Sequence, residues 1–552
     1  MGGVEWWRHA TIYQIYPLSF ADGNDDGYGD LPGVISRLGH LAGEPQSLGV
    51  DAIWLSPIYR SPMVDFGYDV VDHCAVDPRF GSLDDAEALI RTAHKRGLRV
   101  LLDYVPNHTS DEHEWFQRSR RSRTDPFRDW YVWADPAPDG GPPNNWLSAF
   151  ERVGGAWTFD PATGQYYLHS YTAQQPDLNW RNPEVRYAMH DVLRFWLDRG
   201  VDGFRVDAPH RLGKDALLRD NPPDVVDLRL ATQVDDRRHR NLDDPFVHHI
   251  LRELRAVTDS YPSTVLVGEV GIHHRARRLR YYGSGDELQL AFDFGFWANP
   301  WDGLAFRASG LEQATSTSGW PTHALSNHDI SRHASRYALH TRGGIDTMAR
   351  ARVAAVLLTT LPGTTFLYYG EEIGMTDVAV PPVLATDPNG RDPERTPMQW
   401  DMNLVSAGFS NDRPWLPTPA YGVDVASQRA DPDSLLNLYR RLLQLRHAHP
   451  CLRSDDYEDV EAGPDVYAYR RTCGNNKLMV LLNFADARQP VAVVRDWTDA
   501  RLILSTHRRE LNSVVDRQEL VLAPNEAVIV ELKAKRGLIT MVAQLPAVVA
   551  GR

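Results

Sequence analysis

Three acidic residues of this chain stand at the ends of short apolar segments, a place where carboxylates are unusual. Asp207 lies near the end of VDGFRVDA, Glu269 near the end of TVLVGEV, and Asp329 at the end of THALSNHD. Each segment is typical of a buried strand, and burying an unpaired carboxylate is costly. Strands that nevertheless end on acids are expected to converge on one polar pocket. Three carboxyl groups in one pocket predict catalysis by a nucleophile and a general acid.

The immediate neighbours of the acids predict different roles for them. Arg205 precedes Asp207 by two positions, so both side chains point the same way from a strand. The guanidinium would keep Asp207 ionised, as a nucleophile requires. Glu269 follows the apolar run VLVG, a setting that raises the pKa of a carboxyl group and suits a general acid. A structural ion pair or a helix cap would account for Asp207 or Asp329 singly, but their repetition at successive strand ends favours a catalytic site.

The elements that must position these acids alternate between strands and helices. Eight strand-like segments are expected, at residues 11–17, 51–57, 98–105, 201–208, 264–270, 288–294, 323–327 and 364–369. Helix-period stretches lie between them, with a cap at Ser82 and a stop at Gly97 for one, and with Pro183 and Gly200 at the ends of another. Catalytic groups at the tips of several parallel strands are typical of a (β/α)₈ barrel. The predicted fold class is therefore α/β, with a (β/α)₈ TIM barrel at its centre.

Three regions depart from the barrel pattern. Residues 106–180 are too long for a loop and predict a subdomain inserted after the third strand. The 62 positions from Asp207 to Glu269 predict a long loop beside the chemistry. After about residue 460 the expected strands have the pattern that is typical of antiparallel sheets, which predicts a β-sandwich. The expected domains are a barrel at 1–105 and 181–460, a subdomain at 106–180 and a C-terminal β-sandwich at 461–552. The tail at 537–552 has no assigned structure.

Composition restricts the class of partner. The 552 residues carry a net charge of −14, which argues against nucleic acid and favours a small neutral substrate. Three cysteines without framework spacing favour a reducing compartment, and neither a secretory signal nor a membrane-spanning run is seen. We expect a cytoplasmic protein without a membrane partner, as a monomer or homodimer.

The segments quoted above, with LLDYVPNH, resemble the four signature regions of the α-amylase superfamily, glycoside hydrolase family thirteen. The resemblance extends in order from Trp6 to about Leu532. The further segments GYDVVD, PNNW, QPDLNW and RTPMQW resemble the α-glucosidase and oligo-1,6-glucosidase branch. The resemblance implies a retaining glycoside hydrolase that acts by double displacement. Asp207 would be its nucleophile and Glu269 its general acid, while Asp329 would hold the distorted sugar ring.

The same resemblance implies a set of substrate-binding residues around one terminal glucose. They are Tyr68, Asp69, His108, Phe150, Arg205, His328, and one or both of Arg391 and Arg395. His108 could instead be a packed core histidine, but its place after a strand tip favours a role in the site. Phe150 is expected to form a wall of the acceptor site.

The segment DGNDDGYGD predicts a structural cation. Its oxygen-bearing residues alternate, and the spacing resembles the first half of an EF-hand loop. The expected ligands are Asp22, Asn24, Asp26, Asp30 and the backbone carbonyl of Tyr28, around Ca²⁺ or Mg²⁺. An ordinary Asp/Asn turn without a metal is the alternative. We expect no cofactor or metal for catalysis.

The leading functional hypothesis is an exo-acting α-glucosidase with some transglucosylation. Ala208, just after the proposed nucleophile, favours α-1,4 over α-1,6 linkages, because relatives with α-1,6 specificity often carry Val there. Two alternatives stay within the family: an oligo-1,6-glucosidase, and a trehalose synthase or sucrose isomerase type of transglucosylase. A catalytically dead ectodomain of a membrane transporter would lack these acids and carry a membrane helix.

An exo-acting enzyme must block the space beyond the terminal glucose. We expect Asp69 to pair with Arg391 or Arg395 over the non-reducing end, because loops from opposite ends of the barrel order meet there. The subdomain at 106–180 would cap this closed pocket.

Overall fold

The computed structural model describes residues 5–222, 239–272, 274–314, 319–338, 347–491, 500–515 and 520–532. The expected tail at 537–552 lies outside these described residues. So does part of the long loop between Asp207 and Glu269, at 223–238.

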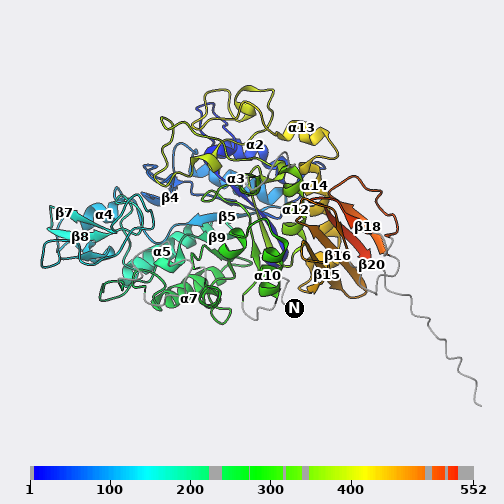
Figure 1. Ribbon diagram of the computed structural model, residues 1–552. Helices are drawn as coiled ribbons and strands as arrows, with labels where there is room; N and C mark the ends of the chain where they lie inside the picture. The colour runs from blue at the N-terminus through cyan, green and yellow to red at the C-terminus, as the bar shows by residue number, and fades with distance from the viewer. Residues whose placement is uncertain are drawn as a thin grey trace, which may run out of the picture.

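A parallel sheet of eight strands forms the centre of the molecule, as the alternating pattern predicts (Figure 1). Its order is β11-β10-β9-β5-β2-β1-β13-β12, and β1 pairs with both β2 and β13, so the first and last strands of the pattern lie in one curved sheet. The strands are β1 (Thr11–Ile15), β2 (Ala52–Leu55), β5 (Arg99–Tyr104), β9 (Gly203–Val206), β10 (Val265–Gly268), β11 (Leu290–Ala291), β12 (Thr322–His323) and β13 (Thr364–Tyr368). The prediction of a (β/α)₈ barrel is confirmed.

The two faces of the strands bury different clusters. Inside the barrel, Ile12, Trp54, Leu101, Val267 and Phe366 belong to one apolar cluster. The alternate positions on the same strands join the larger cluster that packs against the helices. Both faces are covered, which is why the strands have nearly continuous apolar sequences rather than alternating ones.

Helices follow the strands and carry the local signals expected from the sequence. Helix α3 (Leu83–Lys95) begins with a capping box between Ser82 and Asp85, and α5 (Pro183–Leu197) begins at the Asn182 cap with proline in its first turn. The remaining helices are α1 (Pro17–Phe20), α2 (Leu31–Leu41), α4 (Glu114–Ser119), α7 (Phe246–Asp259), α8 (Arg275–Arg278), α9 (Phe294–Trp297), α10 (Gly303–Ala314), α11 (His333–Ala338), α12 (Thr347–Thr360), α13 (Val425–Ala430) and α14 (Leu435–Ala448).

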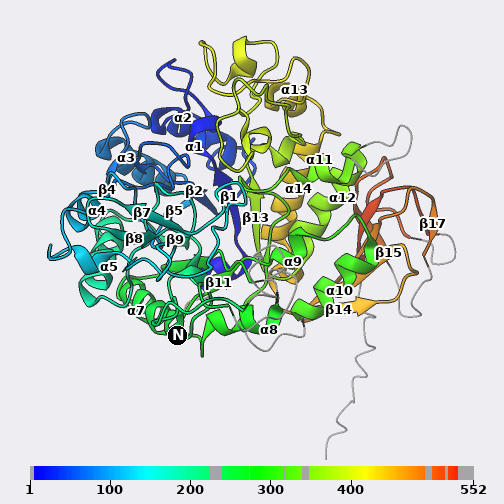
Figure 2. The same ribbon diagram turned by 60° about the vertical axis from the view of Figure 1, so that its left-hand side comes forward.

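The first third of the chain also forms two smaller sheets outside the barrel. A hairpin joins β3 (Tyr59–Arg60) to β4 (Asp72–Val76), and the order β6-β8-β7 forms a three-stranded antiparallel sheet. The latter consists of β6 (Trp133–Ala134), β7 (Trp157–Asp160) and β8 (Gln165–Leu168), all within the predicted insertion at 106–180. In Figures 1 and 2 this region lies on the side of the barrel away from the C-terminal strands.

The C-terminal part is antiparallel, as predicted. A five-stranded sheet has the order β14-β15-β16-β20-β18, and a two-stranded sheet pairs β17 with β19. The strands are β14 (Glu458–Val460), β15 (Val466–Cys473), β16 (Asn476–Asn483), β17 (Gln489–Pro490), β18 (Ala500–Ser505), β19 (Val521–Leu522) and β20 (Ala527–Leu532). One face joins the barrel core through Tyr467 and Leu482, and the other buries Met479 and Val530 in a separate cluster.

No helix within the described ranges is long and apolar enough to cross a membrane.

Candidate active site

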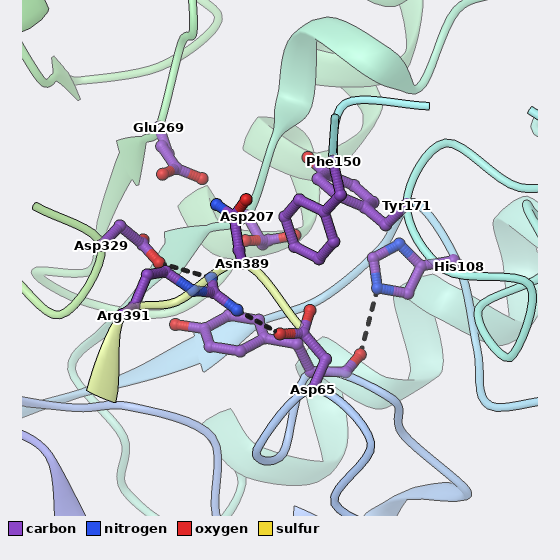
Figure 3. Close-up of a pocket in the computed structure, with 10 residues that line it drawn as sticks. Asp65, His108, Phe150, Tyr171, Asp207, Glu269, Asp329, Asn389 and Arg391 are labelled. Atoms are coloured by element: carbon purple, nitrogen blue, oxygen red, sulfur yellow. Dashed lines mark hydrogen bonds and ion pairs between the residues drawn. The ribbon is translucent and has the colours of Figure 1, made fainter. Parts of the chain in front are cut away.

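A cavity of about 170 Å³ opens at the carboxyl ends of the barrel strands (Figure 3). It is smaller than the roughly 300–1,000 Å³ pockets that hold drug-sized ligands. Its size therefore fits one sugar ring better than a chain. The lining residues are Asp65, Tyr68, His108, Phe150, Tyr171, Asp207, Glu269, Asp329, Asn389 and Arg391.

All three acids predicted from the strand ends line this cavity. Asp207 directly follows β9, Glu269 directly follows β10, and Asp329 lies in the loop after β12. In Figure 3 the three carboxylates point into the same space from the side of the barrel strands. The structure thus brings together the groups that the sequence placed at different strand tips.

One buried arginine holds the first two acids in place. Arg205 donates from Nη1 to Asp207 Oδ1 at 2.7 Å, and its Nη2 lies 2.7 Å from Glu269 Oε2. Arg205 Nη1 also donates to Asp103 Oδ1 at 2.8 Å inside the barrel. The predicted contact of Arg205 with Asp207 is confirmed, but the guanidinium also pairs with Glu269, which the sequence did not indicate. Arg205 is 1% exposed and is not part of the cavity lining, so it positions the acids from behind.

Burial and neighbouring charges give the three carboxyl groups of the site different pKa values. Burial raises the pKa of Glu269 to about 8, against the opposing effect of Arg205. Burial also raises the pKa of Asp207, to about 7, and Arg205 again opposes it. Burial disfavours the charge of Asp329 too, but the positive charges of Arg391, Arg395 and Arg205 hold its pKa well below the ordinary value. At neutral pH Glu269 keeps a proton to donate and Asp329 is ionised.

His328 and Tyr68 form the floor beside Asp329. Their rings stack with centroids 5.4 Å apart, and Tyr68 Oη lies 2.6 Å from His328 Nε2. Gln14 donates its amide to His328 Nδ1 at 2.8 Å, which assigns the proton to Nε2. Burial lowers the pKa of His328 well below its ordinary value, so the ring is neutral. His328 is fully buried behind Tyr68, and Tyr68 is the one of the two that lines the cavity.

Arg391 closes one end of the cavity. Its Nη1 donates to Asp329 Oδ1 at 2.8 Å, and its Nη2 donates to Asp65 Oδ1 at 2.6 Å and to Asp387 Oδ1 at 2.7 Å. Asp65 also accepts a hydrogen bond from Gln175 Nε2 at 2.9 Å. In the sheet, β2 and β13 lie on either side of the single strand β1. The loops that follow these two strands are therefore close enough to meet at this end of the cavity.

The prediction that Asp69 grips the substrate is wrong in its choice of residue. Asp69 is fully buried, and its carboxylate accepts hydrogen bonds from Ser61 Oγ and from the backbone N–H groups of Val64 and Asp65. It therefore folds the loop, while Asp65 reaches the cavity in its place. Arg395 is also fully buried, where its Nε donates to the His328 carbonyl at 2.7 Å. It supports the Asp329 loop rather than the rim.

Aromatic side chains form the other wall. Phe150 and Tyr171 come from the inserted region and pack edge to face with centroids 5.2 Å apart, and the His108 ring lies 5.2 Å from Tyr171. Figure 3 shows Tyr171 and the Arg391–Asp65 pair on opposite sides of the cavity. The sequence prediction included Phe150 and His108 but missed Tyr171 and Asn389, which lie on loops without a periodic pattern.

Ala208 has an unusual backbone. It adopts the left-handed region at φ 39°, and its N–H lies 3.4 Å from Glu269 Oε2. Non-glycine residues seldom adopt this conformation, and it is more strained still for β-branched side chains. Ala208 is 1% exposed and does not line the cavity, so the structure gives it no direct contact with the space for an acceptor sugar.

The proposed cation loop forms a compact turn. Asp22 accepts hydrogen bonds from the N–H groups of Asp25 and Gly27, and Asp30 caps α2 by accepting from Gly33. Burial and the nearby charges of Asp22 and Asp26 raise the pKa of Asp30. Over the described residues, no three His, Cys, Asp or Glu side chains lie together as a metal-binding group. A cation here would need the Asn24 amide oxygen and the Tyr28 carbonyl as well as the acids.

Comparisons with known proteins agree with this geometry. Residues 14–455 match the family described as "Alpha amylase, catalytic domain". A probable α-glucosidase of Rhizobium meliloti (strain 1021) is 44% identical, over 87% of this chain and 90% of the relative. An oligo-1,6-glucosidase of Parageobacillus thermoglucosidasius is 35% identical, over 96% and 99%. The crystal structure of an α-glucosyl transfer enzyme, XgtA, superposes with a TM-score of 0.86 at 39% identity, over 96% and 99%.

Proposed function

The chain belongs to the α-amylase family of glycoside hydrolases, and we propose that it is an exo-acting retaining α-glucosidase. Its substrates would be short maltooligosaccharides or disaccharides with a terminal non-reducing glucose. The observation that carries this proposal is a one-sugar cavity with three acids on one side and the Arg391–Asp65 pair closing its end.

The arrangement of the acids supports a double displacement. Asp207 attacks the anomeric carbon while Glu269 donates its proton to the glycosidic oxygen, and the aglycone leaves as an alcohol. Glu269, now a carboxylate, then takes a proton from water, and the resulting attack releases glucose and Asp207. Retaining enzymes need the two carboxyl groups about 5–5.5 Å apart. Pairing of both acids with the single Arg205 guanidinium favours such a short separation.

The closed end supports exo action. Arg391 bridges Asp65 and Asp329 by two of its nitrogens, so another sugar beyond the terminal glucose would have to break buried ion pairs. We expect glucose to appear early from soluble starch, with little loss of viscosity. Rapid loss of viscosity before glucose appears would refute exo action.

The proposal also covers the type of glycosidic linkage that the enzyme prefers. We propose that the small Ala208 favours maltose over isomaltose. Because Ala208 does not line the cavity, its effect would pass through Glu269, whose Oε2 lies 3.4 Å from the Ala208 N–H, and would amount to only about 1–3 kcal/mol. The oligo-1,6-glucosidase alternative predicts the reverse ratio of kcat/KM on the two disaccharides, and measuring that ratio decides between them.

Transfer to sugars is a second candidate activity. The likeness to an α-glucosyl transfer enzyme favours it, and a glucosyl-enzyme formed on Asp207 can react with a sugar hydroxyl instead of water. A trehalose synthase or sucrose isomerase would form an isomeric disaccharide as its main product. Product analysis at high maltose concentration separates these activities from hydrolysis.

The decisive experiment uses p-nitrophenyl α-glucoside with wild type and Asp207→Asn. We expect wild-type release of p-nitrophenol and first release of glucose as the α-anomer, seen by NMR. Loss of the nucleophile should lower kcat by about 10⁴-fold or more. An inactive wild type, or unchanged activity in Asp207→Asn, would remove the proposal and both transfer alternatives together.

Three secondary expectations complete the proposal. We propose a structural Ca²⁺ or Mg²⁺ in the loop at 22–30, and a monomer or homodimer in solution. We also propose a cytoplasmic location, supported by the free thiols of Cys74, Cys451 and Cys473.

A further inference from the structure

Most polar side chains that line the cavity have a hydrogen-bond or ion-pair partner within the protein. They are Asp65, Tyr68, His108, Asp207, Glu269, Asp329 and Arg391. The side-chain amide of Asn389 and the hydroxyl of Tyr171 line the same cavity, but neither forms a hydrogen bond with any described residue. These two groups have a hydrogen-bonding capacity that the protein itself does not use.

Asn389 is held in place by a turn that does not use its amide. The turn runs from Asp387 to Gly390, whose N–H donates to the Asp387 carbonyl at 3.2 Å. The Asp387 carboxylate accepts the N–H groups of Asn389 at 3.1 Å and of Arg391 at 2.6 Å, and it also binds the Arg391 guanidinium. Turns are often fixed by an Asx side chain that binds the backbone, and Asp387 supplies that contact here. The exposed side chain of Asn389 therefore stands on a fixed support.

The turn lies at the end of the cavity where we place the aglycone. Gly390 packs against Arg152 of the inserted region, since a Cβ atom at Gly390 would lie 3.4 Å from Arg152 Nη2. Arg152 follows Phe150 of the aromatic wall by two positions. In Figure 3 the Asn389 side chain extends into the cavity in the direction of Glu269, the acid that would protonate the leaving group. The amide thus borders the space beside the bond to be cleaved.

Tyr171 borders the same space from the inserted region. Its ring packs on Phe150 with centroids 5.2 Å apart, and Figure 3 shows it on the side of the cavity opposite the Arg391–Asp65 pair. Burial raises the pKa of Tyr171 well above its usual range, so the hydroxyl keeps its proton and can donate it in a hydrogen bond. A phenolic hydroxyl and a side-chain amide each both donate and accept, which matches the hydroxyl groups of a sugar.

We propose that the Asn389 amide and the Tyr171 hydroxyl bind hydroxyl groups of a sugar in the leaving-group position. This inference rests on the proposed function and names the class of leaving group, which is a sugar rather than an apolar alcohol. A leaving group without further hydroxyls would displace water from both side chains without replacing its hydrogen bonds, and would lose transition-state binding. Asn389 and Tyr171 are therefore specificity-determining residues.

The test compares two substrates whose leaving groups are six-membered rings. One is maltose or isomaltose, whichever the wild type cleaves faster, and the other is cyclohexyl α-glucoside, whose ring carries no further hydroxyl. The readout is the ratio of the two kcat/KM values, disaccharide over cyclohexyl compound, from initial rates of glucose release. We expect Asn389→Ala to lower this ratio by about two- to tenfold, the value of one hydrogen bond. Tyr171→Phe, which removes only the hydroxyl, should lower it by a similar factor.

Controls separate this inference from a structural role and from the proposed function itself. Asn475→Ala removes an exposed asparagine from the turn between β15 and β16 and should leave the ratio as in wild type. An unchanged ratio in either site variant, including an equal loss on both substrates, would overturn the inference, because the residue would then only shape the cavity or bind the glucose ring. So would a wild type that cleaves the cyclohexyl compound as well as the disaccharide. A wild type inactive on p-nitrophenyl α-glucoside would instead refute the proposed function.

Discussion

The two ends of the cavity are built in opposite ways. At the glucose end, Arg391 binds Asp65, Asp329 and Asp387, and each polar group has a fixed partner. At the other end, where we place the aglycone, Tyr171 offers its ring, and Phe150 packs on Tyr171 and extends toward Arg391. A network of short ion pairs fits a ligand group of one shape, whereas aromatic surfaces can pack against groups of several shapes. Under the proposed function, this contrast would select one glycone and accept a range of leaving groups.

Replacing Arg391, which binds three carboxylates at the glucose end, is the change with the largest expected effect. Arg391→Met leaves Asp65 without its cation, while Asp329 and Asp387 keep only the longer ion pairs with Arg395 at 3.2 and 3.4 Å. We therefore expect the substrate ring to lose its fixed position. We expect kcat/KM to fall by about 100-fold on maltose and on p-nitrophenyl α-glucoside alike.

Arg391→Lys is the matched control for charge. One ammonium group cannot reproduce the planar fork that reaches three carboxylates, so we expect little recovery of activity. Full recovery in Arg391→Lys, or a loss confined to one of the two substrates, would contradict the role given to the glucose end.

The pH dependence tests the acids that lie between the two ends. Asp207 must be ionised to attack, and burial raises its pKa to about 7, so activity should fall as pH drops below that value. Glu269 must be protonated, and its pKa of about 8 sets the loss of activity at higher pH. We expect a bell-shaped profile of kcat/KM on maltose with a maximum between these limbs, each limb changing the rate about tenfold per pH unit.

Glu269→Gln assigns the alkaline limb. Its residual activity on p-nitrophenyl α-glucoside, whose leaving group needs no proton, should show no decrease above about pH 8. An alkaline limb that persists in Glu269→Gln would mean that another group titrates there.

A smaller effect is expected at the aglycone end. Phe150→Leu keeps an apolar side chain but removes the ring that packs on Tyr171 and lies 5.1 Å from the Arg391 guanidinium. Loss of such ring contacts costs about 0.5–1.5 kcal/mol, which is a few-fold in kcat/KM. The change should differ between maltose and p-nitrophenyl α-glucoside, because only the leaving group differs. Equal losses on both would place Phe150 at the glucose end instead.

The smallest effect concerns the loop at 22–30, which does not line the cavity. If it binds Ca²⁺, calcium added after treatment with EDTA should raise the unfolding temperature by a few degrees through selective binding to the folded state. The rise should be absent in Asp26→Asn, which removes one ligand charge and leaves the Asp30 cap of α2 in place. An identical rise in both proteins would show that any bound calcium lies elsewhere.

The same two ends differ in how far the sequence predicts them. The strand-end acids were predictable because a carboxylate directly after a buried apolar run is costly unless it faces a polar site, and parallel strands end at one edge. Asp65 and Asp69 lie four positions apart in one loop, and spacing alone cannot tell which carboxylate faces outward. The left-handed turn at Gly67, with φ +103°, helps direct Asp69 back into the loop. Tyr171 and Asn389 lie on irregular loops whose paths depend on tertiary contacts.

The pairing of β1 with β13 has a consequence for how the protein is made. Thr11 pairs with Thr365, so the barrel cannot close until roughly 350 further residues have been synthesised, which takes roughly 20 to 70 s on the ribosome. Arg205 and Asp207 leave the ribosome together and can pair at once. Asp65 must wait for Arg391, the group that completes the glucose end. The Arg205–Asp207 ion pair can thus form before the barrel closes, whereas the closed end of the cavity can form only after residue 391 has been synthesised.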